Sequence, residues 1–273
     1  MRASKVLLVF RKDWREISRN WQVMMPIIIV PLLFTIALPV IVTLVPEIVN
    51  VPTSSTAFLE LMLENLPAQL QSQLSGMTES QVMTYVMLLY FFAPFFLIIP
   101  VMASSVIASD SFAGEKERKT IEALLATPIT DGELLLGKAL VSFLPSVAVT
   151  AASFLLYSAT VDLLTYRAFG RLLLPNLDWI VLIFGLTPAI ALASVGLTVI
   201  ISARVKGFRE AQQMSAVLIV PIIAMLLAQA SGALIFGASV VGALTLLFAL
   251  FDLLIFRFGV RLFRRESILS QVG

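Results

Sequence analysis

Five long stretches without a charged side chain constrain the fold of this chain more than any other feature. They are Asn20–Pro46, Ser80–Ser109, Ala139–Val161, Trp179–Ala203 and Ala211–Phe251. A helix of about 20 apolar residues crosses the hydrocarbon core of a bilayer. Each of the first four stretches therefore predicts one span. The fifth is long enough for two, joined by a turn near residues 231–239.

This pattern predicts an all-α integral membrane protein with one transmembrane domain over residues 1–273. We place its six transmembrane helices at residues 22–46, 82–109, 139–161, 179–203, 212–231 and 239–257. Only 13% of the residues are charged, whereas soluble domains average about 25%. The chain has no histidine and no cysteine, which excludes disulfides and metal or nucleophilic sites built on either residue. We therefore expect no enzymatic activity and no cofactor.

The lysines and arginines predict the orientation, because basic side chains resist translocation across a membrane. Seventeen of the nineteen lie on one side of the predicted topology, and only Arg167 and Arg171 lie on the other. Both termini and the segment 110–138 are thus predicted to be cytoplasmic in a multi-pass protein of the cell membrane. Residues 47–81 and 162–178 become outer loops. The net charge of +2 then reflects contact with anionic lipid headgroups, and no nucleic acid partner is expected.

Residues 1–20 have the spacing of an amphipathic helix, with apolar side chains at Val6, Leu7, Phe10, Trp14 and Ile17. Such a helix lies in the headgroup plane with its apolar face toward the lipid. Its simplest role is anchoring, and contact with a cytoplasmic partner is the alternative. In the first outer loop, residues 57–74 have helix-like spacing and predict a cap at the mouth of a pore, where substrate selection is a second possibility.

The segment 110–138 is rich in charge and has a defined local pattern. Glu115 is spaced to pair with Arg118 and Lys119. Pro128 ends a short helix, because proline disfavours helical geometry in the residue before it. Thr130 and Glu133 then form a capping box that opens the third span. A solvated loop would not need this order, so we predict a short helix that is tied to the second and third spans and moves them together.

The residues Glu115–Pro128, followed by Glu133 and Gly137-Lys138, resemble the signature of ABC-2 type permeases. These are membrane subunits of ABC exporters, and the sodium-efflux and drug- or lipid-export branch is the most similar. The resemblance implies that the segment is a coupling helix seated in a groove of a cytoplasmic ATPase subunit. It also implies that a second permease copy or a homologue is a partner. The sequence departs from the family pattern at Lys119, where many members have glycine. The implied ATPase-coupling residues are Glu115, Glu117, Arg118, Thr120, Glu122, Leu124, Leu125 and Pro128.

Two other features of the sequence have some properties of a functional site. Gly132–Lys138 matches most of a phosphate-binding loop, but Ala139 replaces the hydroxyl that would bind magnesium, and the leucines between the glycines open a helix. ATP hydrolysis is therefore expected on a partner chain. Asp252 is the one acidic residue inside the predicted spans, and such residues are often functional. We favour an ion pair at the cytoplasmic end over a role in gating or ion coupling.

The sequence thus predicts the permease subunit of an ATP-driven exporter, with partners that are an ABC ATPase, a second permease and membrane lipids. The main alternative is a secondary transporter or channel working alone. That alternative needs polar groups near the middle of the membrane, and only Asp252 is available. A membrane scaffold that recruits a cytoplasmic regulator is the third possibility. The sequence does not identify the cargo.

Overall fold

The computed structural model describes residues 2–49, 74–120, 127–231 and 237–262, and every regular element in these ranges is a helix. Six helical runs are long and apolar enough to cross a membrane, by length and composition. The prediction of an all-helical chain with six candidate spans is therefore confirmed. The runs are Trp21–Leu44, Glu79–Glu117, Asp131–Phe169, Leu177–Arg204, Phe208–Gln229 and Ala238–Ile255.

Several runs combine two or more helical elements. The short helix α1 (Ala3–Ile17) precedes the first run. The elements of the six runs, in order, are α2 (Trp21–Leu32), η1 (Leu33–Ala37) and α3 (Leu38–Val49); α6 (Glu79–Val86), η2 (Met87–Phe91), α7 (Phe92–Phe96), α8 (Ile98–Ser109), η3 (Asp110–Gly114) and α9 (Glu115–Glu117); α11 (Asp131–Phe169); α12 (Leu177–Val181), η4 (Leu182–Leu186) and α13 (Thr187–Arg204); α14 (Phe208–Ser215), η5 (Ala216–Ile219) and α15 (Val220–Ala230); and α16 (Ala238–Leu262).

The helices around the charged segment are longer than the predicted spans. The second run continues from residue 109 through Glu117, because residues 110–115 are buried among neighbouring helices instead of lying in solvent. The third run begins at Asp131, behind the predicted Thr130–Glu133 capping box, and ends at Phe169. It therefore extends into the predicted outer loop 162–178. Most of the predicted loop 47–81, including its cap helix, lies outside the described residues.

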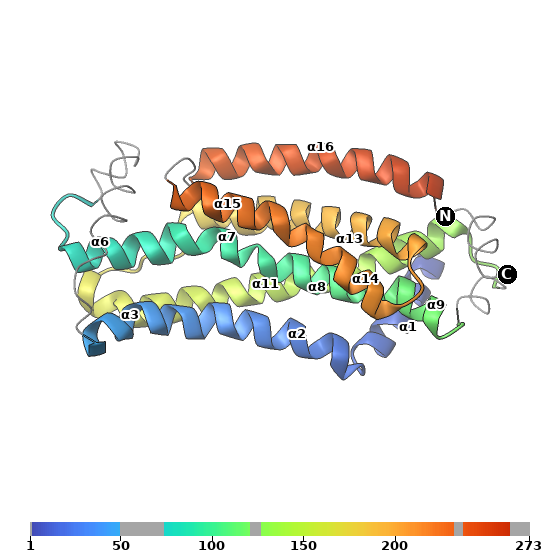
Figure 1. Ribbon diagram of the computed structural model, residues 1–273, viewed down its shortest axis with the longest axis horizontal. Helices are drawn as coiled ribbons and strands as arrows, with labels where there is room; N and C mark the ends of the chain where they lie inside the picture. The colour runs from blue at the N-terminus through green and yellow to red at the C-terminus, as the bar shows by residue number, and fades with distance from the viewer. Residues whose placement is uncertain (1, 50–73, 121–126, 232–236, 263–273) are drawn as a thin grey trace.

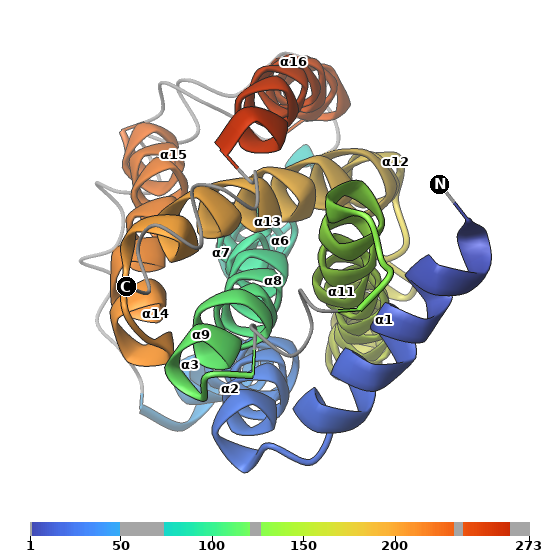
Figure 2. The same cartoon turned by 90° about the vertical axis from the view of Figure 1, so that its right-hand side faces the viewer.

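The second run is the centre of the bundle. In its most apolar window 72% of the residues are buried, compared with 17% in each of the last two runs. Helix α8 packs against both α11 and α13, as the end view in Figure 2 shows. Helices α2, α15 and α16 lie at the periphery (Figures 1 and 2), and α1 lies across the outside of α11.

In its first half, the second run is interrupted by the π-helical element η2. Pro94, one turn further on, has no amide hydrogen, so the Tyr90 carbonyl lacks its usual helical donor. Side chains from three other elements donate to successive carbonyls here: the Tyr157 hydroxyl to Leu88 (2.6 Å), the Trp179 indole to Leu89 (2.9 Å) and the Gln229 amide to Tyr90 (2.7 Å). The irregular backbone is thus stabilised by neutral donors.

Candidate coupling site

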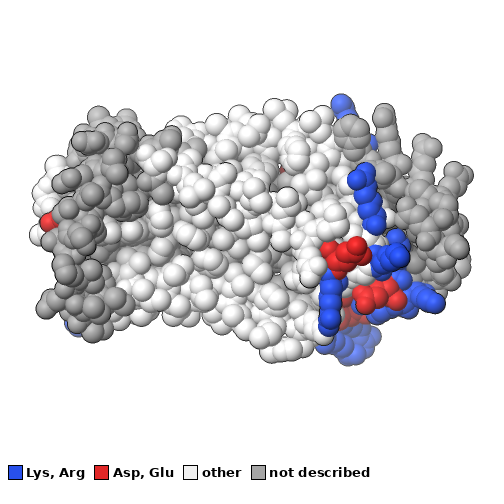
Figure 3. Space-filling view, viewed as in Figure 1, with Lys and Arg blue, Asp and Glu red and all other residues white. Residues whose placement is uncertain are grey.

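Charged side chains gather at one end of the bundle, where α1, α9 and α14 lie. Figure 3 shows lysine, arginine and acidic side chains together at this end, whereas the long middle of the same face is nearly free of them. The grouping agrees with the predicted clustering of basic residues on one side of a membrane. We call this region the charged end. Its assignment to the cytoplasm stays a prediction.

Helix α9 ends in a regular C-terminal cap at the charged end. The Lys119 amide donates to the Lys116 carbonyl (3.2 Å), and the Thr120 amide donates to the Glu115 carbonyl (3.0 Å). This pair of bonds is a Schellman motif, which requires a left-handed residue after the helix. Lys119 occupies that position with φ 57°. The backbone thus has glycine-like geometry at the residue where the resemblance leads us to expect glycine.

Lys138 is the centre of a buried ion-pair network. Its Nζ atom lies 2.9 Å from Asp13 Oδ2 and 2.7 Å from Glu115 Oε2, and all three side chains are only 1% exposed. The ammonium group also donates to the Ser111 carbonyl at 2.7 Å, and the Ser111 hydroxyl donates to Asp13 Oδ2 at 2.7 Å. The network therefore joins α1, the end of the second run and the start of α11.

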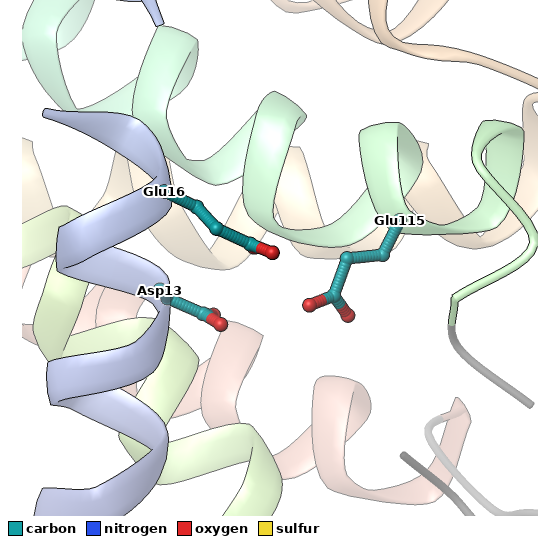
Figure 4. Close-up of side chains that lie close together, drawn as sticks. All are labelled: Asp13, Glu16 and Glu115. Carbon is teal, nitrogen blue, oxygen red and sulfur yellow. The ribbon is translucent and has the colours of Figure 1, made fainter. Parts of the chain in front are cut away.

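Asp13, Glu16 and Glu115 bring carboxylate oxygens within 4.8 Å of one another (Figure 4). Such a group could hold a metal ion, but two ammonium groups already lie among these carboxylates. Lys12 pairs with Glu115, with Asp13 (3.2 Å) and with Glu16 (3.3 Å), and Lys138 supplies the second cation. The arrangement is therefore an ion-pair network of lysines and carboxylates.

The network shifts the pKa values of its α1 members toward their charged forms. Burial opposes ionisation of Asp13, but the ammonium groups of Lys138 and Lys12 and the Ser111 hydroxyl outweigh it and hold the pKa of Asp13 below its usual value. Burial likewise opposes the charge on Lys12, but its bond to Glu115 and the charges of Asp13, Glu115 and Glu16 raise its pKa. Both groups are therefore charged at neutral pH.

The start of α1 is fastened to the same region. The Arg2 amide donates to Glu133 Oε1 at 2.7 Å, and Lys5 Nζ donates to the Pro128 carbonyl. Near the middle of α1, a Cβ atom added to Gly137 would lie 2.7 Å from Val9 Cβ. Glycine is needed here because the two helices approach so closely. Helix α1 thus spans the two sides of the charged segment, from Pro128 and Glu133 to Glu115.

Helix α1 buries only part of its predicted apolar face against the bundle. Val6, Val9, Asp13 and Ile17 are buried, whereas Leu7 and Trp14, which the spacing assigned to the apolar face, are exposed. Val6 and Ile17 are buried because α1 packs on α11 through a face that also includes the ionised Asp13. The exposed apolar edge agrees with a helix at the membrane boundary, where an open groove is lined by Ala3, Val6, Leu7, Phe10, Leu136, Leu140 and Leu144.

The predicted coupling residues fall into three groups. Glu115 and Glu117 bond to other helices of this chain: Glu115 pairs with Lys12 and Lys138 instead of Arg118 and Lys119, and Glu117 Oε2 accepts the Phe208 amide at 2.8 Å. Arg118, Thr120 and Pro128 are exposed at the charged end, although Arg118 also pairs with Asp110 at 3.0 Å. Glu122, Leu124 and Leu125 lie outside the described residues.

Asp252 lies on α16, away from the predicted coupling residues. Its side chain is buried, and among the described residues no ion pair to it is present. The ion pair favoured from the sequence is thus not seen in the part of the chain that the structure describes. The role of Asp252, in an ion pair or in gating, stays a prediction.

Sequence reasoning missed Asp13 and Lys138 as partners. Lys138 stands in the family signature and in an incomplete phosphate-loop pattern, and neither indicates a partner on α1. Gly132–Lys138 is in fact near the beginning of α11. The available signal was Asp13 itself, the one acidic residue within the first fifteen, on the side of an amphipathic helix that has apolar neighbours at Val9 and Ile17.

A family model for ABC-2 family transporter proteins matches residues 7–256. The chain belongs to this family. A comparison with curated proteins gave no match. The matched region includes α1 from Leu7 onward, the charged segment and all six candidate spans. The protein is therefore a multi-pass membrane permease of the kind found in ABC transporters, a family whose members normally work with a cytoplasmic ATPase.

Proposed function

We propose that this ABC-2 permease is the membrane subunit of an ATP-driven exporter and that its charged end faces the cytoplasm. An ATPase subunit docks on the charged segment, chiefly on Arg118, Thr120, Glu122, Leu124, Leu125 and Pro128. Two permease chains, or this chain with a homologue, form the translocation path. ATP hydrolysis takes place on the partner chain.

The observation that carries this proposal is the attachment of the charged segment. On one side it continues the helix of the second run without a break, and on the other it opens the uninterrupted helix α11. Force applied to the segment therefore acts on two long helices directly, and on α1 through Lys138. Arg118, Thr120 and Pro128 lie exposed at the same end and offer a surface for a soluble partner.

The test is capture of the tagged chain from its native membranes in mild detergent. Wild type should retain a stoichiometric ATPase, and Glu122→Arg and Leu125→Asp should each lose it. Arg15→Asp is the matched control, because Arg15 is an exposed charge of the same end outside the segment. Recovery of the chain alone, with wild type and variants alike, would overturn the proposal.

Orientation has its own test, because the chain contains no cysteine. Single cysteines at Thr120 and at Arg171, which are both exposed, can be treated with a membrane-impermeant maleimide in intact cells and in permeabilised cells. Arg171→Cys should react in intact cells, and Thr120→Cys should react only after permeabilisation. The reverse pattern would place the charged end outside.

The buried Asp252 favours one second candidate, a stand-alone ion-coupled transporter. An acidic side chain that is buried on a candidate span, without an ion pair in the described part of the chain, is a possible ion-binding group. On this hypothesis the purified chain in liposomes should carry ions down a gradient without any ATPase, and Asp252→Asn should abolish the flux. Flux that requires the ATPase would exclude it.

A further inference from the structure

The junction between α13 and α14 is held by two neighbouring residues of α9. Lys116 Nζ donates to the Val205 carbonyl at 3.1 Å, and Glu117 Oε2 accepts the Phe208 amide at 2.8 Å. Val205 directly follows α13, and Phe208 is the first residue of α14. The charged segment is therefore attached to the fourth and fifth runs as well as to the second and third.

The contact of Glu117 with α14 is chemically specific. Amides in the first turn of a helix have no partner within that helix, and the partial positive charge at this end favours a carboxylate. Glu117 supplies both needs from a position 91 residues away in the chain. A Cβ atom added to Gly207 would lie 2.7 Å from Glu117 Oε2, so the carboxylate rests directly against the backbone before α14.

We propose that Glu117 is a positioning residue that carries displacement of the charged segment to the fifth run. The inference rests on the proposed coupling function. Glu115 joins this single turn of helix to α1 and α11, and Glu117 joins it to α14, which continues through η5 into α15. Without Glu117, movement of the segment acts directly on the second and third runs but loses its bond to the fifth.

Distance measurements between spin labels test this without knowledge of the cargo. One pair of spin-labelled cysteines, at Gln213 and Arg171, measures the distance from α14 to the end of α11 that lies away from the charged end. A second pair, at Lys119 and Arg171, measures the distance from the charged segment to the same reference point. The permease is measured with its captured ATPase in nanodiscs, before and after trapping with ATP and vanadate. Both distances should shift in wild type. In Glu117→Ala the Gln213 shift should be lost while the Lys119 shift remains.

Three further variants test whether the effect of Glu117→Ala comes from loss of its bond to α14 or from a general loss of structure. Glu117→Gln keeps an oxygen that accepts the Phe208 amide, so it should restore the Gln213 shift. Gly207→Ala displaces the Glu117 carboxylate and should reproduce the loss, but it should add nothing in the Glu117→Ala background. Glu210→Ala is the matched control, because Glu210 accepts only the nearby Lys206 amide at 3.0 Å among the described contacts; it should keep both shifts.

Two outcomes would overturn the inference: a Gln213 shift that persists in Glu117→Ala, or loss of both shifts together in that variant. If wild type shows no nucleotide-dependent shift at either pair, the proposed coupling function itself fails, and this inference fails with it. The two failures are therefore distinguishable.

Discussion

The second run is held at two places by opposite kinds of chemistry. Around Pro94 its backbone carbonyls accept hydrogen bonds from the neutral side chains of Tyr157, Trp179 and Gln229. At the charged end, Glu115 is held by the ammonium groups of Lys12 and Lys138. The first site secures a distorted backbone, and the second secures a side chain.

The difference follows from the surroundings of each site. Deep in an apolar bundle, a free carbonyl is costly, and a neutral donor satisfies it without burying a charge. Near the membrane boundary, charges can be buried if they are paired and hydrogen-bonded, and such pairs fail when one member is lost. The comparison predicts that loss of one member of the Lys138 ion-pair network costs more than loss of one donor around Pro94.

The largest effect is expected for Lys138→Met. The change leaves the carboxylates of Asp13 and Glu115 buried with only Lys12 beside them, which should destabilise the fold by about 3–5 kcal/mol. Thermal unfolding in detergent measures it. The triple variant Asp13→Asn, Glu115→Gln, Lys138→Met removes the unpaired charges and should regain much of the loss. If Lys138→Met were as stable as wild type, the ion-pair network would not be needed for the stability of the fold.

Tyr157→Phe should have the next largest effect. It keeps the ring but removes the hydroxyl that donates to the Leu88 carbonyl, and a buried acceptor left unpaired costs about 1–3 kcal/mol. Thermal unfolding in the same detergent compares it with Tyr166→Phe, which alters an exposed tyrosine of the same helix. Equal unfolding temperatures for the two variants would show that the carbonyl does not need the hydroxyl.

A double-mutant cycle tests whether Pro94 is the reason that the Tyr90 carbonyl needs the Gln229 amide. Gln229→Leu should cost about 1–2 kcal/mol, because the Tyr90 carbonyl then loses the side-chain donor at 2.7 Å. In a Pro94→Ala background the new amide can donate to that carbonyl, so the same change should cost less by about 1 kcal/mol. Unfolding of the four proteins gives the coupling. An identical cost in both backgrounds would refute the link between the proline and the glutamine.

A smaller, stabilising effect is expected for Lys119→Gly. Left-handed geometry costs a residue with a side chain about 1–2 kcal/mol. Glycine removes this cost, but its greater freedom in the unfolded chain offsets part of the gain in stability. The net gain should be about 0.5–1 kcal/mol. Lys119→Ala is the control, since it removes the charge but keeps the Cβ atom. If alanine stabilises as much as glycine, the backbone geometry is not the cause.

The smallest effect is expected from pH. The lowered pKa of Asp13 stabilises the fold above the usual aspartate range, and this stability is lost as pH falls through the lowered pKa. The raised pKa of Lys12 stabilises the fold at pH values below the usual lysine range. This stability is lost as the pH rises through the raised pKa. Attachment of α1 should therefore stay constant from about pH 5 to 9. Hydrogen exchange in α1 measures it, and a step near pH 7 would contradict the assignment.

Local signals in the sequence were sufficient for much of the fold. The uncharged stretches gave the number of candidate spans, and Thr130 with Glu133 gave the start of α11, because a capping box needs only residues three apart. The ABC-2 family was recognisable from the charged segment. Each of these features depends on neighbours in the chain.

The sequence was less informative where partners are distant. Glu115 has plausible local partners in Arg118 and Lys119, yet its actual partners come from α1 and α11. A local pattern cannot rank these choices, because burial decides them and burial depends on the packed helices. The same holds for Glu117, whose partner is a backbone amide and therefore has no sequence signature.

The separation of Asp13 from Lys138 by 125 residues has a consequence for biosynthesis. Asp13 leaves the ribosome first, and its cationic partner on α11 does not exist until two membrane spans have already been made. Helix α1 can therefore form its ion pair with Lys138 only after the start of the third span has been synthesised. Its attachment is a late event in assembly, although α1 is synthesised before all six candidate spans.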